Sequence, residues 1–194
     1  MTARRRRGAH DAPLLAWGEA LRAEKKRRTD LRRRIAVAGA GLGLLLLSAA
    51  LPPTPRLVWN ASASAPIGLY WVTPGMWADP GDMVIARLPQ RYRGLAAIRR
   101  YLPLNVPLVK RAVAYAGDQV CARGRHIFVN GRRVAERRDA DAAGRTMPSW
   151  RGCITLRGRQ LFLLMDDPAS FDGRYFGPTE GSDVIGKAQL LWRR

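Results

Sequence analysis

Two residue types in this sequence could together carry out nucleophilic catalysis: a serine in a segment of small residues and a lysine in an apolar segment. Ser64 lies within residues 60–70, where serines alternate with alanines, and Lys110 lies within residues 107–113. A serine hydroxyl is a poor nucleophile until a base takes its proton, so Ser64 needs a partner such as Lys110 elsewhere in the chain. Taken alone, both features have commoner explanations, because an Ala/Ser-rich segment after prolines is usually a linker and a Lys-Arg pair is usually exposed.

The lysine can act as a base only if the protein lowers its pKa. A lysine in water has a pKa of about 10.4 and is protonated at neutral pH, whereas burial among apolar groups disfavours the charged form. On an extended strand, Leu108 and Ala112 would lie on the same face as Lys110, and Arg111 would point the other way. The pattern therefore predicts one basic residue facing inward and one facing outward.

The other reactive residue types do not form a recognised site. Two cysteines and two histidines far apart in the sequence match no zinc-binding spacing, and the sequence has no phosphate-binding glycine loop. We therefore expect no metal ion and no cofactor. A Ser-His-Asp site would depend on His126 alone, and a histidine on a strand is more often structural.

Cys121 and Cys153 fall at the ends of predicted strands, in the part of the chain that we expect to be exported. In an oxidising compartment two such cysteines can form a disulfide, which is the interpretation that we favour. In a reducing compartment they would instead be two buried free thiols that behave as small hydrophobic residues.

An uncharged apolar run, Ile35–Leu51, is predicted to form a transmembrane helix that anchors the chain. About 17 residues at roughly 1.5 Å per residue span about 26 Å, which is just enough for the hydrocarbon core of a bilayer. The positive-inside rule places Arg32–Arg34 and the N-terminus in the cytoplasm, so the chain after Pro52 should lie outside. A cleavable signal peptide is the main alternative, because Ser48–Ala50 resembles a cleavage site. A buried core helix is a weaker alternative, because every face of the run is apolar and the basic cluster lies at one end.

The net charge of +19 predicts an anionic partner, either nucleic acid or a membrane surface. Residues 1–34 carry a net charge of +8 and lie directly before the predicted span, while the remaining arginines are scattered along the rest of the chain. This distribution favours attraction to anionic membrane lipid, and we expect no binding to nucleic acid.

Downstream of the prolines at positions 52, 53 and 55, which end the helix and stiffen a connector, the sequence predicts a mainly β domain. Short apolar or β-branched runs bounded by Gly, Pro or Asp are typical of strands. The runs with these properties cover residues 68–72, 82–88, 107–115, 119–122, 126–129, 133–136, 153–156, 160–165 and 183–192.

Three connections of this domain carry their own signals. Asn130-Gly131 lies between two predicted strands and indicates a type I′ hairpin turn, which needs positive φ at both positions. The pattern of residues 94–102 predicts one short helix, and residues 137–149 are predicted to be an irregular loop. The chain is therefore expected to have four parts, namely a basic tail (1–34), the transmembrane helix (35–51), a connector (52–59) and one folded domain (60–194).

Three blocks of sequence follow the predicted anchor in a fixed order. They are Asn60-x-Ser62-x-Ser64-x-Pro66-x-Gly68-Leu-Tyr70, then Leu108-Val-Lys110-Arg-Ala-Val113 with Gly117-Asp118, then Ser170-Phe-Asp172-Gly-Arg174-Tyr-Phe-Gly177 with Val184-Ile-Gly-Lys-Ala188. From Asn60 to the end, the chain resembles the type I signal peptidases and in particular the TraF-type conjugative transfer peptidases. Each block is a loose pattern, but the combination and its order behind a single anchor are specific.

This resemblance implies a Ser/Lys dyad on a signal-peptidase-like β-rich fold. Ser64 would attack the scissile carbonyl and Lys110 would be the general base. By the same resemblance, Ser170 would hydrogen-bond and orient Lys110, and Ser62 would join the backbone N–H of Ser64 in an oxyanion hole.

The resemblance also implies a structural ion pair between Asp172 and Arg174 beside the site. The alternative for these two residues is an ordinary surface pair, which would contribute little to stability. One departure from the family pattern is that the usual Gly-Asp-Asn before the third block reads Met165-Asp-Asp-Pro168, so no role is transferred to Asp166 or Asp167.

The function implied by the resemblance is that of a membrane-anchored serine endopeptidase, anchored in the inner membrane with its catalytic domain in the periplasm. Its substrates would be exported precursor proteins cut after small residues, with a conjugative pilin precursor as the leading candidate and cyclisation as one possible outcome. A general leader peptidase is the alternative with the same chemistry. The alternative of another class is a non-enzymatic, basic, membrane-anchored subunit of a transfer channel, in which the serines would not matter.

Overall fold

A computed structural model describes residues 12–50 and 54–194 and divides the chain into two units between residues 53 and 54. The first unit is helix α1, Ala12–Ala50. Its part from Ala16 to Ala50 is long and apolar enough to cross a membrane, a property that an anchor and a signal sequence share. This part includes the predicted span except Leu51, which lies outside the described residues together with residues 1–11, 52 and 53.

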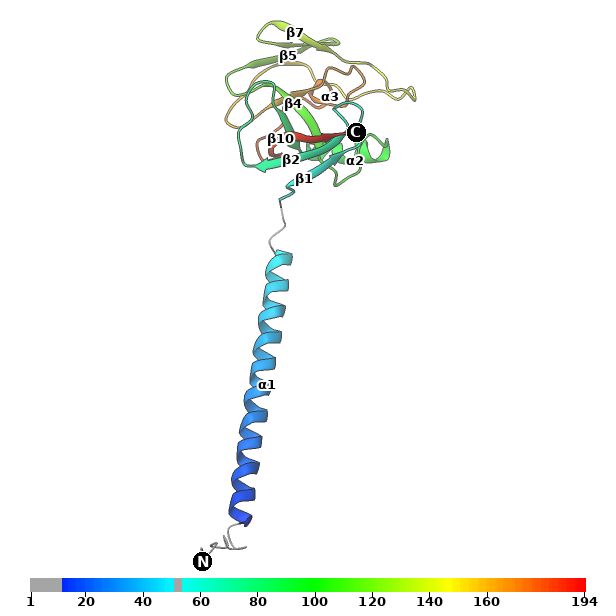
Figure 1. Cartoon of the computed structure of the whole chain (residues 1–194). Helices are drawn as coiled ribbons and strands as arrows, with labels where there is room; N and C mark the ends of the chain where they lie inside the picture. The colour runs from blue at the N-terminus through cyan, green and yellow to red at the C-terminus, as the bar shows by residue number, and fades with distance from the viewer. Residues whose placement is uncertain (1–11, 51–53) are drawn as a thin grey trace, which may run out of the picture. The chain divides into compact units, whose positions relative to one another are not determined.

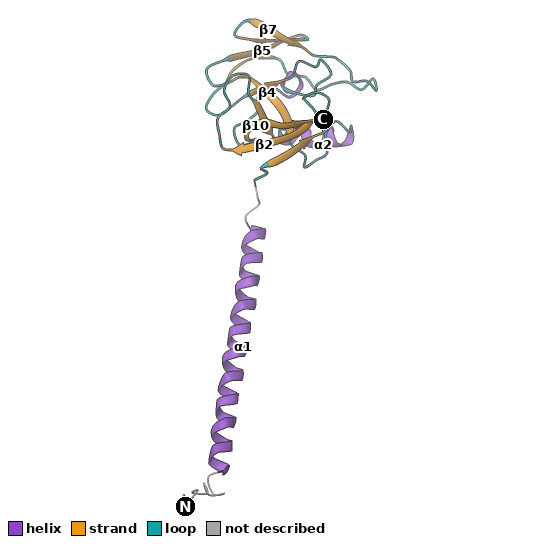
Figure 2. Ribbon diagram, viewed as in Figure 1, coloured by secondary structure: helices purple, strands orange, loops and turns teal. Residues whose placement is uncertain are grey.

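The second unit is built from two antiparallel sheets (Figures 1 and 2). The larger sheet has the order β1-β2-β10-β3-β4-β9, with β1 Leu57–Asn60, β2 Gly68–Pro74, β10 Val184–Arg193, β3 Met83–Ala86, β4 Leu108–Ala114 and β9 Phe162–Leu164. The smaller sheet has the order β7-β6-β5-β8, with β7 Arg132–Glu136, β6 His126–Val129, β5 Gln119–Arg123 and β8 Gly152–Thr155. The prediction of a mainly β domain behind an apolar N-terminal helix is confirmed.

Two short helices accompany the sheets, whereas the sequence predicted one. Helix α2, Gln90–Ile98, begins and ends four residues earlier than the predicted helix, so that boundary prediction was wrong. The backbone leaves the helix after Arg99, because Arg100 has a φ of 59° and therefore cannot continue a right-handed helix. Helix α3, Gly173–Phe176, is a single turn that the sequence did not predict, and Asp172 caps it by accepting a hydrogen bond from the backbone N–H of Arg174.

The hairpin predicted at Asn130-Gly131 is present between β6 and β7. Val129 pairs with Arg132, and the two residues between them have positive φ angles of 49° and 78°. Positive φ at both central positions is what a type I′ turn requires, and glycine adopts it without a steric cost.

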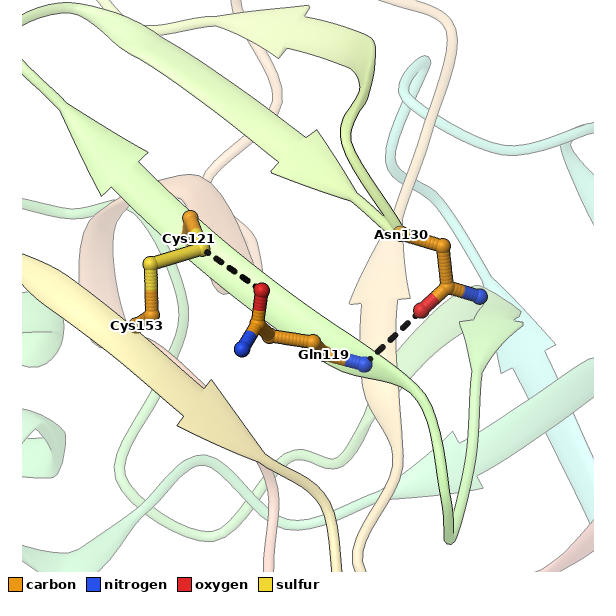
Figure 3. The surroundings of a disulfide bond; sticks show 4 residues. All are labelled: Gln119, Cys121, Asn130 and Cys153. Carbon is orange, nitrogen blue, oxygen red and sulfur yellow. Dashed lines mark hydrogen bonds between the residues drawn. A yellow bond between two sulfur atoms is a disulfide. The ribbon is translucent and has the colours of Figure 1, made fainter.

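A disulfide joins Cys121 on β5 to Cys153 on β8, which lie directly opposite each other in the sheet (Figure 3). Gln119, on the same strand as Cys121, places Oε1 3.6 Å from the Cys121 sulfur, and its backbone N–H donates to Asn130 Oδ1. The bond closes a loop with a sequence separation of 32 residues, which restricts the unfolded chain. The predicted irregular loop 137–149 lies inside this closed segment.

Candidate active site

Three residues from separate segments meet at one place in the second unit. Ser64 lies in the loop between β1 and β2, Lys110 lies on β4, and Ser170 lies in the loop that precedes α3. Lys110 Nζ donates one hydrogen bond to Ser64 Oγ at 2.8 Å and another to Ser170 Oγ at 2.8 Å. A direct hydrogen bond between a hydroxyl and an amine is the geometry that proton transfer to a base requires.

The position of Lys110 in the sheet explains why it is buried. Strand β4 lies between β3 and β9, and Lys110 is only 4% exposed. Leu108 and Ala112, two residues away on either side, are also buried, while Arg111 is partly exposed. Val109 is buried as well, in a core cluster with Tyr70 and Ile85, so both faces of β4 are covered at this point.

Burial changes the acid–base behaviour of Lys110. Loss of solvation lowers the pKa of Lys110 from 10.5 to about 8, because the charged ammonium is disfavoured away from water. Smaller effects come from Asp172 and Asp167, which raise the pKa, and from Arg174, which lowers it. A lysine with a pKa of about 8 is neutral in about a tenth of the molecules at pH 7, so it can accept a proton.

The loop that carries Ser64 is held by the side chain of Asn60, the last residue of β1. Asn60 is 7% exposed, and its Nδ2 donates to the carbonyl oxygens of Ser62 (2.9 Å), Ala65 (3.1 Å) and Pro66 (3.1 Å). Its Oδ1 accepts from the backbone N–H of Ser62 at 3.1 Å. Asn60 belongs to the first sequence block but was assigned no role, although the side chain of Asn often closes a turn by bonding the backbone two residues further on.

Ser62 lies beside Ser64 and contacts it in two ways. The two Oγ atoms are 3.0 Å apart, and the backbone N–H of Ser64 points toward Ser62 Oγ at 3.4 Å. The hydroxyl of Ser62 therefore lies next to both the Oγ and the backbone N–H of Ser64, and this N–H is directed at Ser62 Oγ.

Asp172 and Arg174 form a buried ion pair beneath this site, with side chains 0% and 3% exposed. Asp172 Oδ1 accepts from Arg174 Nε at 2.8 Å, and Oδ2 accepts from the backbone N–H of Met165 at 3.1 Å. Arg174 also donates to the carbonyl oxygen of Met165 at 2.6 Å. These bonds tie the end of β9 to α3 and thereby fix the short loop that presents Ser170.

Two cavities flank Ser64. The larger, of about 760 Å³, is lined by residues 59–64 and by residues 106–110. The smaller, of about 480 Å³, is lined by residues 63–67 and by Arg111. The chain segments 59–67 and 106–111 therefore both run, in sequence order, from the larger cavity to the smaller, and they pass the contact between Ser64 and Lys110.

Comparison with known proteins supports the same family as the sequence blocks. The sequence model of one protein family, signal peptidase of the peptidase S26 type, matches residues 30–193. The chain belongs to this family.

Relatives in this family include transfer proteins of plasmids. A plasmid transfer protein TraF from Escherichia coli is 32% identical over 167 residues, which cover 80% of this chain and 92% of that protein. A conjugal transfer protein TraF from Agrobacterium fabrum is 29% identical over 143 residues, which cover 69% of this chain and 80% of that protein. The solved signal peptidase I of Enterococcus faecalis matches 60% of this chain and 98% of its own, with 19% identity and a TM-score of 0.34.

The two aspartates to which the resemblance transferred no role have different surroundings. Asp166 is largely exposed and pairs with Arg111, with oxygens 3.0 and 2.9 Å from Arg111 Nη1, a surface contact of small energetic value. Asp167 lines both cavities. Its Oδ1 accepts from the N–H of Ala169 at 2.8 Å and its carbonyl oxygen accepts from the N–H of Ser170 at 3.0 Å, so Asp167 shapes the turn that leads to Ser170.

The remaining reactive side chains lie elsewhere. His126 is on β6 of the smaller sheet, with Nδ1 3.9 Å from Glu136 Oε2, and among the described residues this nitrogen has no hydrogen-bond partner. Within residues 12–50 and 54–194, no three His, Cys, Asp or Glu side chains are grouped closely enough to hold a metal ion.

Proposed function

We propose that this signal peptidase family member is a serine endopeptidase in which Ser64 is the nucleophile and Lys110 the general base. The observation that carries the proposal is the 2.8 Å hydrogen bond from a buried lysine of lowered pKa to a serine that lies between two cavities. Neutral Lys110 would take the proton of Ser64 as its oxygen attacks the scissile carbonyl, and would then give that proton to the leaving amine.

Ser170 and Ser62 would support this reaction in different ways. Ser170 accepts the second hydrogen bond of Lys110 Nζ, which holds the amine in line with Ser64. The long contact of 3.4 Å between Ser64 N–H and Ser62 Oγ would open when a carbonyl oxygen enters. Both groups could then donate to the negative oxygen that develops in the transition state.

We infer that the substrates are exported precursor proteins cut after small residues, with a conjugative pilin precursor as the leading candidate. The family supports a protein substrate, and the names of the relatives from Escherichia coli and Agrobacterium fabrum, which are transfer proteins, support the pilin. The acyl-enzyme on Ser64 would be opened by water to release a mature pilin, or by an amine of the same chain to give a cyclic one.

In this proposal α1 is retained as an anchor in the inner membrane. The arginines at 32–34 precede its uncharged part, so the N-terminus would stay in the cytoplasm and the β domain would face the periplasm. An exported location also agrees with the disulfide, because such bonds persist in oxidising compartments.

The proposal is tested in a strain that lacks the gene and is complemented with the full-length chain or a variant. The intact mass of the precursor that accumulates in the deletion strain identifies the substrate, and its loss of mass upon complementation gives the cleavage site. Ser64→Ala and Lys110→Arg should both leave the precursor uncut, because alanine removes the nucleophile and arginine keeps the charge but does not act as a base.

Matched controls exist in the same domain. Lys187→Arg should process the precursor normally, because Lys187 Nζ pairs with Asp82 at 2.6 Å and with Asp79 at 3.5 Å, and arginine can keep these contacts. Ser149→Ala changes an exposed loop serine and should also be silent. Normal processing by Lys110→Arg would refute the dyad, and normal processing by Ser64→Ala would favour the non-enzymatic channel subunit. Many uncut precursors in place of one would indicate a general leader peptidase.

A further inference from the structure

The smaller cavity beside Ser64 differs from the larger one in its charged lining. Five of its eleven lining residues are charged, whereas four of the 24 residues around the larger cavity are. The five are Arg111, Asp166, Asp167, Arg193 and Arg194. The arginines at 193 and 194 take no part in the hydrogen bonds between Lys110 and the two serines, so the proposed chemistry leaves them without a role.

The end of β10 is fixed beside the chain that follows Ser64. Arg193 lies opposite Gly68 in the pairing of β10 with β2, and the backbone N–H of Arg194 donates to the carbonyl oxygen of Ile67 at 3.0 Å. The strands approach so closely that a Cβ at Gly68 would lie 2.0 Å from a main-chain carbonyl oxygen of β10, so any larger residue would displace the strand. The two arginines are therefore held beside residues that follow the nucleophile by three and four positions.

The charged side chains of the smaller cavity are only partly paired with one another. Arg111 Nη1 lies 3.0 and 2.9 Å from the two carboxylate oxygens of Asp166, and Asp167 Oδ1 accepts a main-chain N–H at 2.8 Å. Within residues 12–50 and 54–194, neither Arg193 nor Arg194 forms an ion pair with a carboxylate. The side chains of this cavity that lack an ion-pair partner are therefore two guanidinium groups and one carboxylate, and the wall formed by β10 is positively charged.

The linings indicate which part of a substrate would reach each cavity. The residue directly before the cut is expected to be small and uncharged, which makes the acyl part complementary to the larger cavity with its mostly uncharged lining. The leaving part would then enter the smaller cavity. Ile67 follows Ser64 by three residues, and three extended residues at about 3.3 Å each span roughly 10 Å. A carboxylate about two to four residues after the cut would therefore reach the arginines of β10.

We propose that Arg193 and Arg194 form a subsite that binds a carboxylate of the leaving part of the substrate, about two to four residues after the scissile bond. The inference rests on the proposed function, in which Lys110 protonates the amine of that leaving part. A guanidinium group matches a carboxylate because its planar N–H groups donate two parallel hydrogen bonds. An acidic side chain and the C-terminal carboxylate of a short leaving segment offer the same chemistry. Cleavage would thus depend on the sequence after the cut as well as on the small residue before it.

The test uses the purified full-length chain in detergent and peptides that span the mapped cleavage site, with products quantified by liquid chromatography and mass spectrometry. One set of peptides is amidated at the C-terminus and carries Glu, Gln or Lys at the second, third or fourth residue after the cut. The other set has no acidic residue after the cut and ends at the fourth residue, with either a free carboxylate or an amide. The two sets distinguish an acidic side chain from a C-terminal carboxylate.

We expect kcat/KM to be about three- to tenfold higher for the carboxylate than for its neutral counterpart in at least one set, because ion pairs at an exposed site are individually weak and two guanidinium groups contribute. Most of the difference should lie in KM, since the subsite is remote from the reacting atoms. In about 1 M salt the ratio should fall toward one, because the Debye length shortens to about 3 Å.

Variants of the two arginines connect this preference to β10. Arg193→Gln combined with Arg194→Gln should bring the ratio close to one, and Arg193→Glu combined with Arg194→Glu should make the Lys peptide a better substrate than the Glu peptide. Both arginines are exposed, so the fold should be retained, which circular dichroism checks. Arg157→Gln removes the same charge from an exposed residue that lines neither cavity and should leave the ratio unchanged.

Two results would overturn the subsite alone. One is the absence of a carboxylate preference in both peptide sets, and the other is a preference that the double glutamine variant retains. No cleavage of any peptide would instead overturn the proposed function and the subsite with it.

Discussion

The rate of peptide cleavage should rise with pH and level off near pH 9, because only neutral Lys110 can take the proton of Ser64. Burial lowers the pKa of Lys110 to about 8. The neutral fraction is then about 9% at pH 7 and about 91% at pH 9, so kcat/KM should increase about tenfold over this range. A lysine that kept a pKa near 10.5 would instead give an increase of about 100-fold and no plateau below pH 10.

A change at Asp167 tests the physical origin of this profile. Asp167 raises the pKa of Lys110 and lines both cavities, so Asp167→Asn should move the midpoint of the profile to lower pH. Asparagine is isosteric and can still accept the hydrogen bond from Ala169, and the bond to Ser170 N–H uses the main chain, so the turn should be preserved. The matched control is Asp166→Asn, which removes a carboxylate that pairs with Arg111 at the surface.

The assay measures initial rates of the full-length chain in detergent from pH 6 to pH 10, with a quenched peptide that has no group titrating in this range. At substrate concentrations well below KM, the rate reports the ionisation of the free enzyme. A profile that is flat between pH 6 and pH 9, or one that rises log-linearly to pH 10, would refute Lys110 as a buried general base. An Asp167→Asn midpoint that moves to higher pH would refute the electrostatic explanation.

Three further substitutions test single parts of the site. Lys110→Met should be inactive yet raise the free energy of unfolding at pH 7 by about 1–3 kcal/mol, because a folded-state pKa of about 8 lies below the unfolded value near 10.5 and the buried ammonium costs stability below pH 8. This gain in urea titrations should shrink toward pH 10.5, and a gain that does not depend on pH would contradict the explanation. Asp172→Asn leaves Arg174 buried without its carboxylate and should lower the free energy of unfolding by about 3–5 kcal/mol in the same titrations, whereas a loss below about 1 kcal/mol would mean that the pair matters little. Asn60→Ala should lower kcat by about 100-fold with KM nearly unchanged, because a shift of about 1 Å in the nucleophile is enough for such a loss. An Asn60→Ala variant with normal kcat would show that the loop holds Ser64 without it.

Most of the strands could be predicted from the sequence because the signals that define them are local, whereas β1 falls largely within the segment that was predicted to be a connector. Alternating apolar residues and bounding turn residues indicate a strand without knowledge of its partner, and Asn130-Gly131 indicates the turn by its own backbone preference. The predicted boundaries of α2 were wrong because helical periodicity does not show where the backbone leaves the helix. Arg100 takes up a positive φ. The hydroxyl of the next residue, Tyr101, donates a hydrogen bond to the carboxylate of Asp141, which is a contact across the fold. A helix of one turn such as α3 is too short to have a periodic pattern.

The sequence by itself determined the residue types of the candidate site, their order along the chain and the presence of an apolar N-terminal helix. Only the tertiary structure decided how far Lys110 is removed from water, because its burial depends on strands β3 and β9, which the chain supplies from before and after β4. It also decided between two interpretations of Asp172 and Arg174, which form a buried pair and not a surface pair. The four hydrogen bonds of Asn60, like the bond from Arg99 Nη1 to the carbonyl oxygen of Thr146, join side chains to main-chain groups. Such bonds leave little trace in a sequence, because a main-chain carbonyl or N–H is the same at almost every residue.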